Sequence, residues 1–255
     1  MKKEYQLKKA LGQHFLHDEN ICLQIVDQLQ YSLDKSLLEI GPGAGALTKY
    51  LLEKPNKAYK VIEIDLEKVT YLNQKYPAIK DKIIHQDFLL SEQPFDESFS
   101  IIGNFPYNIS SPIMFKILDW RSTVDEVLGM FQKEVAQRIA AAHGTKTYGI
   151  LSVLFQAYYK VQYLFDVPPQ AFTPPPKVMS GVLYCKSLGN PYQIDNFNTF
   201  KKFVKLAFSQ RRKTLRNALA PIIPQGIKQD EVFNKRAEQL SVQDFVHLYN
   251  KIYNS

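Results

Sequence analysis

Two patterns of apolar positions alternate along most of the chain: short apolar runs, and longer segments in which apolar residues recur at helical spacing. The apolar runs predict strands within residues 37–40, 58–65, 82–87, 98–108, 124–132 and 181–187. The helical spacing covers residues 47–51, 66–76 and 112–120. Strands that alternate with helices are typical of a parallel sheet covered on both faces. The sequence therefore predicts an α/β fold with a mostly parallel, doubly wound sheet.

The pattern changes near residue 190. Residues 167–178 hold five of the 14 prolines and cannot form the interior of a helix. Beyond the Gly-Asn-Pro at 189–191 only helical spacing remains. We predict that residues 1–190 form an N-terminal arm and a sheet domain, and that residues 191–255 form a small all-helical domain.

A glycine cluster follows the first expected strand. Gly41, Gly43 and Gly45 allow the backbone to turn sharply and to approach a ligand closely. Glu63 ends the next expected strand, where a carboxylate can accept hydrogen bonds from ribose hydroxyls. These residues predict a site for an adenosine-containing cofactor. The alternative is a strand-to-helix turn that binds no ligand.

Asp87 decides between two cofactor classes. Residues 41–46 also satisfy the loose glycine pattern of dinucleotide sites. However, Asp87 follows the third expected strand, where a carboxylate can accept a hydrogen bond from the amino group of an adenine. That arrangement favours a nucleoside-type cofactor such as S-adenosylmethionine. A helix N-cap is the alternative role for Asp87.

The fourth expected strand ends in Asn104-Phe105-Pro106-Tyr107. An Asn-x-Pro-Tyr turn at this place resembles the signature of methyltransferases that modify an exocyclic amino group of a base. The Oδ1 atom of Asn104 and the carbonyl of Pro106 are expected to accept the two N6 hydrogens of an adenine, and Tyr107 is expected to stack on the base. A neutral thioether leaving group needs neither a metal nor a strong base, so positioning supplies most of the rate.

Charge points to a polyanionic partner. The chain has 255 residues with 32 Lys and Arg against 25 Asp and Glu, which gives a net charge of +7. Residues 196–220 carry seven basic and no acidic side chains. A cluster of one sign beside aromatic residues favours binding of a phosphate backbone, although an incidental basic face is the alternative. We name this the basic cluster: Lys201, Lys202, Lys205, Arg211, Arg212, Lys213 and Arg216. Lys2, Lys3, Lys8 and Lys9 add positive charge to the arm.

Several protein classes are excluded by composition. Cys22 and Cys185 are too few and too distant to indicate a disulfide scaffold or a cysteine zinc site, and the five His lack metal-site spacing, so no metal is expected. The basic N-terminus lacks the apolar run of a signal peptide, and no segment is apolar enough to cross a bilayer. We therefore expect a cytoplasmic protein without membrane contact, and we expect a monomer.

Three further segments resemble the ribosomal RNA adenine N6-dimethyltransferase family. They are KKALGQHFLHD at 8–18, FQKEVAQRIAA at 131–141 and VPPQAFTPPPKVMSGV at 167–182, and the resemblance runs from about residue 8 to 220. It implies a Rossmann-like class I methyltransferase fold. It also implies a cofactor site formed by His14, Leu16, Gly41, Gly43, Glu63, Asp87 and Asn104, and an aromatic sandwich of Phe172 with Tyr107 around a flipped adenine. His14 stands where Asn is commoner and Phe105 where Leu is commoner.

The resemblance is strongest to the small-subunit branch. It implies dimethylation of N6 of two adjacent adenosines in the 3′-terminal hairpin loop of 16S rRNA, on pre-30S particles during ribosome biogenesis. Two alternatives stay open at this point: a 23S rRNA methyltransferase of the erythromycin-resistance type, and a small-subunit assembly factor whose binding role outweighs catalysis.

Overall fold

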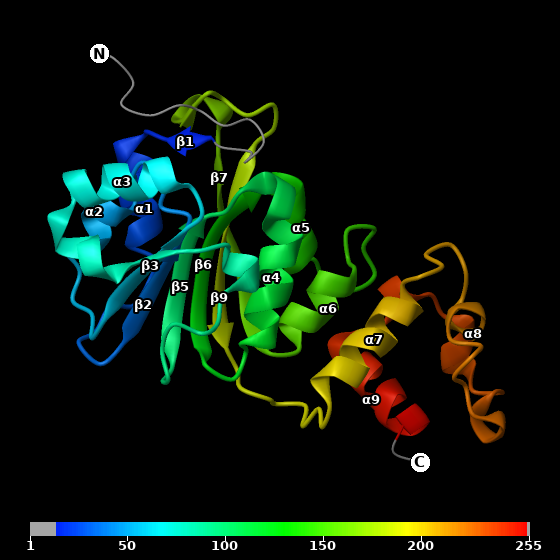
Figure 1. Cartoon of the computed structure of the whole chain (residues 1–255). Helices are drawn as coiled ribbons and strands as arrows, with labels where there is room; N and C mark the ends of the chain where they lie inside the picture. Colours follow the sequence, from blue (N-terminus) through cyan, green and yellow to red (C-terminus); the bar gives the residue numbers. More distant parts are fainter. Residues whose placement is uncertain (1–13, 254–255) are drawn as a thin grey trace. The chain divides into compact units, whose positions relative to one another are not determined.

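The computed structural model describes residues 14–253, which group into two compact units (Figure 1). The first, here called the sheet unit, runs to residue 136 and resumes at 162–187. The second, the helical unit, comprises residues 137–161 and the chain from 188 onward. The lysines of the arm before residue 14 lie outside the described residues. No helix within 14–253 is both long enough and apolar enough to span a membrane.

A seven-stranded sheet has the order β4-β3-β2-β5-β6-β9-β7. The strands from β4 to β6 are parallel, whereas β9 runs antiparallel to β6. A separate two-stranded ribbon pairs β1 with β8. The bounds are β1 (Phe15–Leu16), β2 (Ser36–Ile40), β3 (Tyr59–Glu63), β4 (Ile83–His85), β5 (Phe99–Asn104), β6 (Val124–Gln132), β7 (Tyr159–Val167), β8 (Phe172–Thr173) and β9 (Ser180–Ser187).

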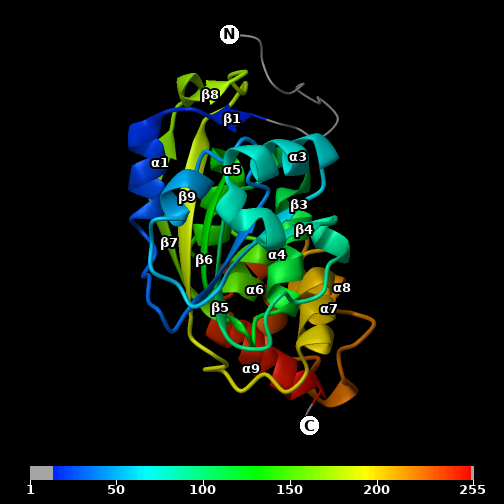
Figure 2. The ribbon, with the colours of Figure 1, turned by 60° about the vertical axis from the view of Figure 1, so that its left-hand side comes forward.

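Helices cover both faces of the sheet. Helices α1 (Glu19–Val26), α2 (Thr48–Leu51) and α3 (Leu66–Lys75) contribute Ile25, Leu51 and Leu72 to one apolar core with Val61 and Ile102 of the strands. Helix α4 (Ser110–Asp119) lies on the opposite side of the sheet (Figures 1 and 2). Because water is excluded from both faces, every residue of β2 is buried. The predicted doubly wound, mostly parallel sheet is thus confirmed.

The helical unit contains the remaining α-helices. They are α6 (Ile150–Gln156), α7 (Phe197–Ala207), α8 (Leu215–Ala218) and α9 (Val242–Tyr253), while α5 (Lys133–Ala140) runs from one unit into the other along the chain. Short 3-10 turns occur in both units. Those of the sheet unit are η2 (Pro77–Lys82), η3 (Phe88–Leu90), η4 (Tyr107–Ile109) and η5 (Pro169–Ala171), and those of the helical unit are η6 (Gln225–Ile227), η7 (Glu231–Asn234) and η8 (Ala237–Gln239). The core of the unit is aromatic, with Phe203 packed edge-on against Phe245.

The division of the chain into these two units differs from the single boundary expected at residue 190. Residues 137–161 lie with the helical unit because α6 packs against α7 and α9. Leu151 to Phe155 of α6 are buried, so this segment supplies core that residues 191–255 would otherwise lack. Strand β7 is a further element that the apolar runs do not predict, since only its first and last residues are fully buried.

Candidate active site

A cavity of about 250 Å³ opens in the sheet unit at the carboxyl ends of β2, β3 and β5. In an α/β sheet, ligands bind at this edge. The cavity brings together nine of the residues that sequence predicts for the site: His14, Leu16, Gly41, Gly43, Glu63, Asp87, Asn104, Pro106 and Tyr107. Segments far apart in the chain therefore meet here, as the predicted parallel topology requires.

The glycine turn depends on backbone conformations that favour glycine. Gly41, Gly43 and Gly45 have φ of 64°, 57° and 81°. A Cβ atom at Gly41 would meet no atom within 4 Å, whereas one at Gly45 would lie 2.5 Å from the ring of Tyr76. The hydroxyl of Tyr76 donates to the carbonyl of Gly45 at 3.3 Å. Close packing against Tyr76 therefore requires glycine at position 45, whereas the space beside Gly41 is open.

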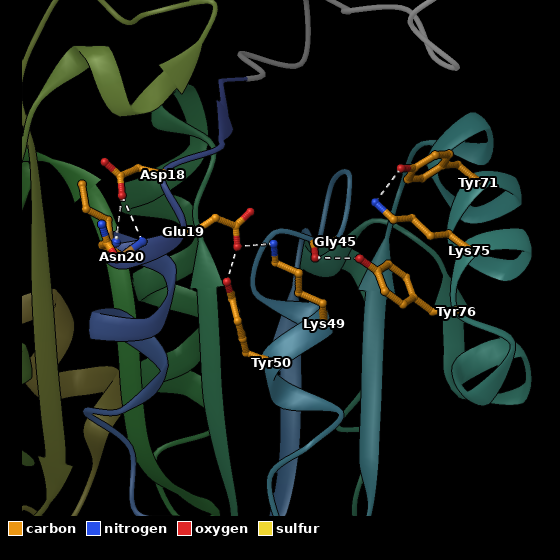
Figure 3. A network of polar contacts seen from close by, with 10 residues as sticks. Asp18, Glu19, Asn20, Gly45, Lys49, Tyr50, Tyr71, Lys75 and Tyr76 are labelled. Atoms are coloured by element: carbon orange, nitrogen blue, oxygen red, sulfur yellow. Dashed lines mark hydrogen bonds and ion pairs between the residues drawn. The ribbon is translucent and has the colours of Figure 1, made fainter. Parts of the chain in front are cut away.

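Polar contacts beside the turn involve residues of three helices (Figure 3). Glu19 of α1 is bonded to both Lys49 and Tyr50 of α2. Lys75 of α3 donates to the hydroxyl of Tyr71 at 2.8 Å. Of these contacts, the Tyr76–Gly45 bond is the one that reaches the glycine turn, and it joins the turn to the residue after α3.

Glu63 joins the end of β3 to the glycine turn. Its carboxylate accepts hydrogen bonds from the Gly43 N–H at 3.2 Å and from the Asp65 N–H at 2.9 Å. Burial raises the pKa of Glu63, and these two backbone donors oppose the shift. The side chain is only 6% exposed and lines the cavity, so it can accept a hydrogen bond from a ligand hydroxyl.

Asp87 caps a helical turn and also lies on the cavity wall. It caps η3 by accepting a hydrogen bond from the Leu89 N–H at 2.9 Å. It also lines the cavity. Because the cap uses one carboxylate oxygen, Oδ1, the second oxygen is available to a ligand amino group.

The Asn-Phe-Pro-Tyr turn uses the carbonyl of Pro106 in its own hydrogen bonds. The Pro106 carbonyl already accepts from the Ile109 N–H at 3.2 Å and from the Ser110 hydroxyl at 3.0 Å, so its lone pairs are used within the turn. The carbonyl of Phe105, also on the cavity wall, accepts no hydrogen bond within residues 14–253. Of these two carbonyls, only that of Phe105 is left without a hydrogen-bond donor among residues 14–253.

Tyr107 is held at its hydroxyl and on its ring. The hydroxyl is hydrogen-bonded to that of Ser180 at the start of β9. The ring stacks on His14 with 5.5 Å between the centroids and 29° between the planes. Burial raises the pKa of Tyr107, so the phenol is neutral at physiological pH.

Phe172 is not where the resemblance to the family places it. Its side chain is 2% exposed, belongs to the apolar core and does not line the cavity. In β8 it is the register partner of Leu16. Phe172 is thus buried where β8 pairs with β1, and in this structure its ring is not exposed for stacking on a base opposite Tyr107.

One acidic residue of the site is absent from the sequence predictions. Glu39, on the cavity wall, accepts hydrogen bonds from Thr48 at 2.8 Å and from Tyr59. Complete burial raises its pKa to about 7, although both hydroxyl donors lower it. The available signal was a charged residue inside the apolar run 37–40, which is costly unless its carboxyl is satisfied.

The basic cluster is divided between surface and structural roles. Lys202, Lys205, Arg211, Arg212 and Lys213 are exposed. Lys201 lies over the ring of Phe197, and Arg211 donates to the carbonyl of Lys146. Arg216 donates to the Lys228 carbonyl and, at 3.0 Å, to Asn234. Arg216 thus connects α8 to the segment after it.

Comparison with known proteins gives a match over nearly the whole chain. The family described as "Ribosomal RNA adenine dimethylase" matches residues 4–254. A "Ribosomal RNA small subunit methyltransferase A" from Cytophaga hutchinsonii is 52% identical, covering 98% of each chain. The protein of the same name from Flavobacterium johnsoniae is 50% identical, covering 98% of this chain and 97% of its own.

Two solved structures have a similar fold. A dimethyladenosine transferase from Plasmodium falciparum superposes with a TM-score of 0.80 at 24% identity, covering 93% of this chain and 98% of its own. The 23S rRNA methyltransferase ErmE superposes with a TM-score of 0.71 at 23% identity, covering 93% and 99%. At such identities the likeness concerns the fold alone.

Proposed function

Because this chain belongs to the ribosomal RNA adenine dimethylase family, we propose that its cavity holds S-adenosylmethionine and presents N6 of an rRNA adenosine to the methyl group. The chain is an rRNA adenine dimethyltransferase of the small-subunit type, since relatives with about half of their residues identical carry that name over nearly their whole length. Membership of the family indicates the reaction. The roles proposed below for the site residues are argued from the geometry of the cavity.

The cofactor is proposed to lie between the glycine turn and the acidic side chains. Glu63 would accept from the ribose hydroxyls and Asp87 from the adenine amino group, because both carboxylates line one cavity and the cap of η3 uses only Oδ1 of Asp87. The open space at Gly41 lets a ligand approach the backbone. When bound, S-adenosylmethionine supplies an electrophilic methyl group whose departure leaves a neutral thioether.

Asn104 and Phe105 are proposed to hold the target amino group. The lone pair of N6 is delocalised into the adenine ring, which makes the nitrogen a poor nucleophile. Two acceptors, Asn104 Oδ1 and the Phe105 carbonyl, would each bind one N6 hydrogen and so favour a more tetrahedral nitrogen. Such fixed acceptors need no rearrangement during the reaction. Tyr107 would stack on the base.

The substrate is proposed to be two adjacent adenosines in the 3′-terminal hairpin loop of 16S rRNA, within a pre-30S particle in the cytoplasm, with a monomeric enzyme. The names of the relatives support the small subunit. The exposed lysines and arginines of the basic cluster support contact with RNA phosphates. This is the observation within the helical unit that favours a large structured RNA over a free nucleoside.

A methyl-transfer assay tests the proposal. Purified protein and labelled S-adenosylmethionine are mixed with immature 30S particles, naked 16S rRNA or 23S rRNA, and the nucleosides are then analysed. The proposal predicts N6,N6-dimethyladenosine with the 30S particle alone. Equal labelling of naked 16S rRNA would contradict the pre-30S requirement, and label in 23S rRNA would indicate the resistance-type activity. Tight 30S binding without label would favour the assembly-factor function.

A further inference from the structure

The first described residues, His14 to Leu16, contact three parts of the site at once. The His14 carbonyl accepts a hydrogen bond from Nδ2 of Asn104 at 3.2 Å. The His14 ring stacks on Tyr107. The ring of Phe15 lies so close to Gly43 that a Cβ atom there would be 3.0 Å from it. Residues 14–16 of the arm therefore lie against both the glycine turn and the Asn-Phe-Pro-Tyr turn.

The hydrogen bond to His14 determines which end of the Asn104 amide faces the cavity. A carbonyl oxygen accepts hydrogen bonds and cannot donate them, so it pairs only with the NH2 end of a carboxamide. This leaves Oδ1, the acceptor, without a partner among the described residues and turned away from the arm. In the flipped orientation Oδ1 would face the His14 oxygen, and an N–H would face the N6 hydrogens of the target base. Only the observed orientation accepts from N6.

The arm itself is fixed by contacts outside the cofactor pocket. Nδ1 of His14 lies 2.8 Å from the carbonyl of Pro174, which can only accept, so Nδ1 is the donor. The His17 N–H donates to the Ala171 carbonyl at 2.9 Å. Leu16 is buried beside Phe172, its partner in the β1–β8 ribbon.

We propose that residues 14–16 are a positioning element for catalysis: the His14 carbonyl holds the Asn104 amide with Oδ1 toward the target amino group. The buried Phe172 contributes by anchoring β1 rather than by stacking on the base. This inference rests on the acceptor role proposed for Asn104. It differs from a simple cover over the cofactor, which would change the KM for S-adenosylmethionine and leave kcat unchanged.

The test is a double-mutant cycle between His14 and Asn104. The variant His14→Ala removes both ring contacts and so loosens the carbonyl. In Asn104→Asp both side-chain oxygens are acceptors, and no orientation has to be selected. We expect His14→Ala to lower kcat about fivefold to tenfold in the otherwise wild-type enzyme, the effect of one hydrogen bond, and less than about twofold when Asn104→Asp is already present. His17→Ala, an exposed side chain two residues beyond Phe15, is the matched control and should leave kcat unchanged.

Two outcomes would overturn the inference. One is an equal loss of kcat in both backgrounds. The other is a raised KM for S-adenosylmethionine with kcat intact. If the wild-type enzyme transfers no methyl group at all, the proposed function fails instead, so the two failures are distinguishable.

A second measurement covers the case in which Asn104→Asp is inactive. The side-chain NH2 signals of Asn104 are assigned in a 15N spectrum by their absence in that variant. His14→Ala should move one amide proton toward the position of a free carboxamide and speed its exchange with water. Signals that do not change between the wild type and His14→Ala would also overturn the inference.

Discussion

The hydroxyl of Tyr107 is hydrogen-bonded to the hydroxyl of Ser180, a completely buried residue at the start of β9. This bond fixes the orientation of the tyrosine ring from behind the turn. Tyr107 lines the cavity and stacks on His14, whereas its hydroxyl is bonded to a core residue. The two functions of Tyr107 can therefore be separated by substitution.

Tyr107→Phe should keep methyl transfer close to the wild-type rate, because the stacking face is retained. It should lower the free energy of unfolding by about 1–3 kcal/mol, because the Ser180 hydroxyl is left buried without its partner. Tyr107→Ala should reduce kcat/KM for RNA about tenfold to 100-fold, since base stacking on an aromatic ring is worth about 1–3 kcal/mol. Urea unfolding and steady-state kinetics measure both. Equal activity losses in the two variants would show that the hydroxyl takes part in the reaction.

Substitution of Gly45 and Gly41 by alanine separates steric from conformational cost. Both positions have positive φ, so both variants pay a similar backbone penalty. Only at Gly45 does the new Cβ atom collide with Tyr76. Gly45→Ala should therefore be less stable than Gly41→Ala by about 1–3 kcal/mol. The fluorescence of Trp120, the single tryptophan, reports unfolding of the sheet unit, and equal stabilities would contradict the packing described here.

Glu39 predicts a specific pH dependence of stability. Its pKa rises from an ordinary value of 4.5 to about 7 on folding, so the folded state holds the proton more tightly than the unfolded state. The contribution of Glu39 to the free energy of unfolding is complete below pH 4.5, the pKa in the unfolded state. It falls by about 1.4 kcal/mol per pH unit as the pH rises from there to the folded-state pKa of about 7. Between pH 5 and 7 the wild type should therefore lose stability relative to Glu39→Gln. Unfolding free energies that stay parallel over this range would contradict the assignment.

The basic cluster contains residues with different expected roles. Arg212→Ala should weaken RNA binding and reduce the slope of log affinity against log salt by about one, as expected for a lost phosphate contact. Arg216→Ala should instead destabilise the helical unit, because it removes the contacts to Lys228 and Asn234. Salt titrations of binding and thermal unfolding separate the two. An unchanged salt slope in Arg212→Ala would remove this residue from the RNA surface.

The sequence predicts those site residues whose chemistry follows from their place at the end of a strand. Glu63, Asp87 and Asn104 each end or follow an apolar run, and parallel strands bring such ends to one edge. The glycine turn is recognised for the same reason, because positive φ is local to the turn. Local pattern and topology were enough for these positions.

The remaining features depend on contacts that the motifs and apolar runs do not reveal. Phe172 is buried because β8 pairs with β1, a contact across more than 150 residues of chain. The Pro106 carbonyl is used by Ser110, which the turn motif alone does not reveal. Residues 137–161 join the helical unit because of packing between α6, α7 and α9. In each case, burial or a hydrogen bond outside the local motif decides the role.

The central claim is that Asn104 holds the amino group that is methylated. Its most direct test is nucleoside analysis of 16S rRNA after reaction of immature 30S particles with the wild type or with Asn104→Ala. The wild type should yield N6,N6-dimethyladenosine at two adjacent positions. Asn104→Ala should bind the particle with similar affinity and transfer at least about 100-fold more slowly, the usual cost of removing one fixed group that stabilises a transition state. Wild-type turnover in Asn104→Ala would contradict the account.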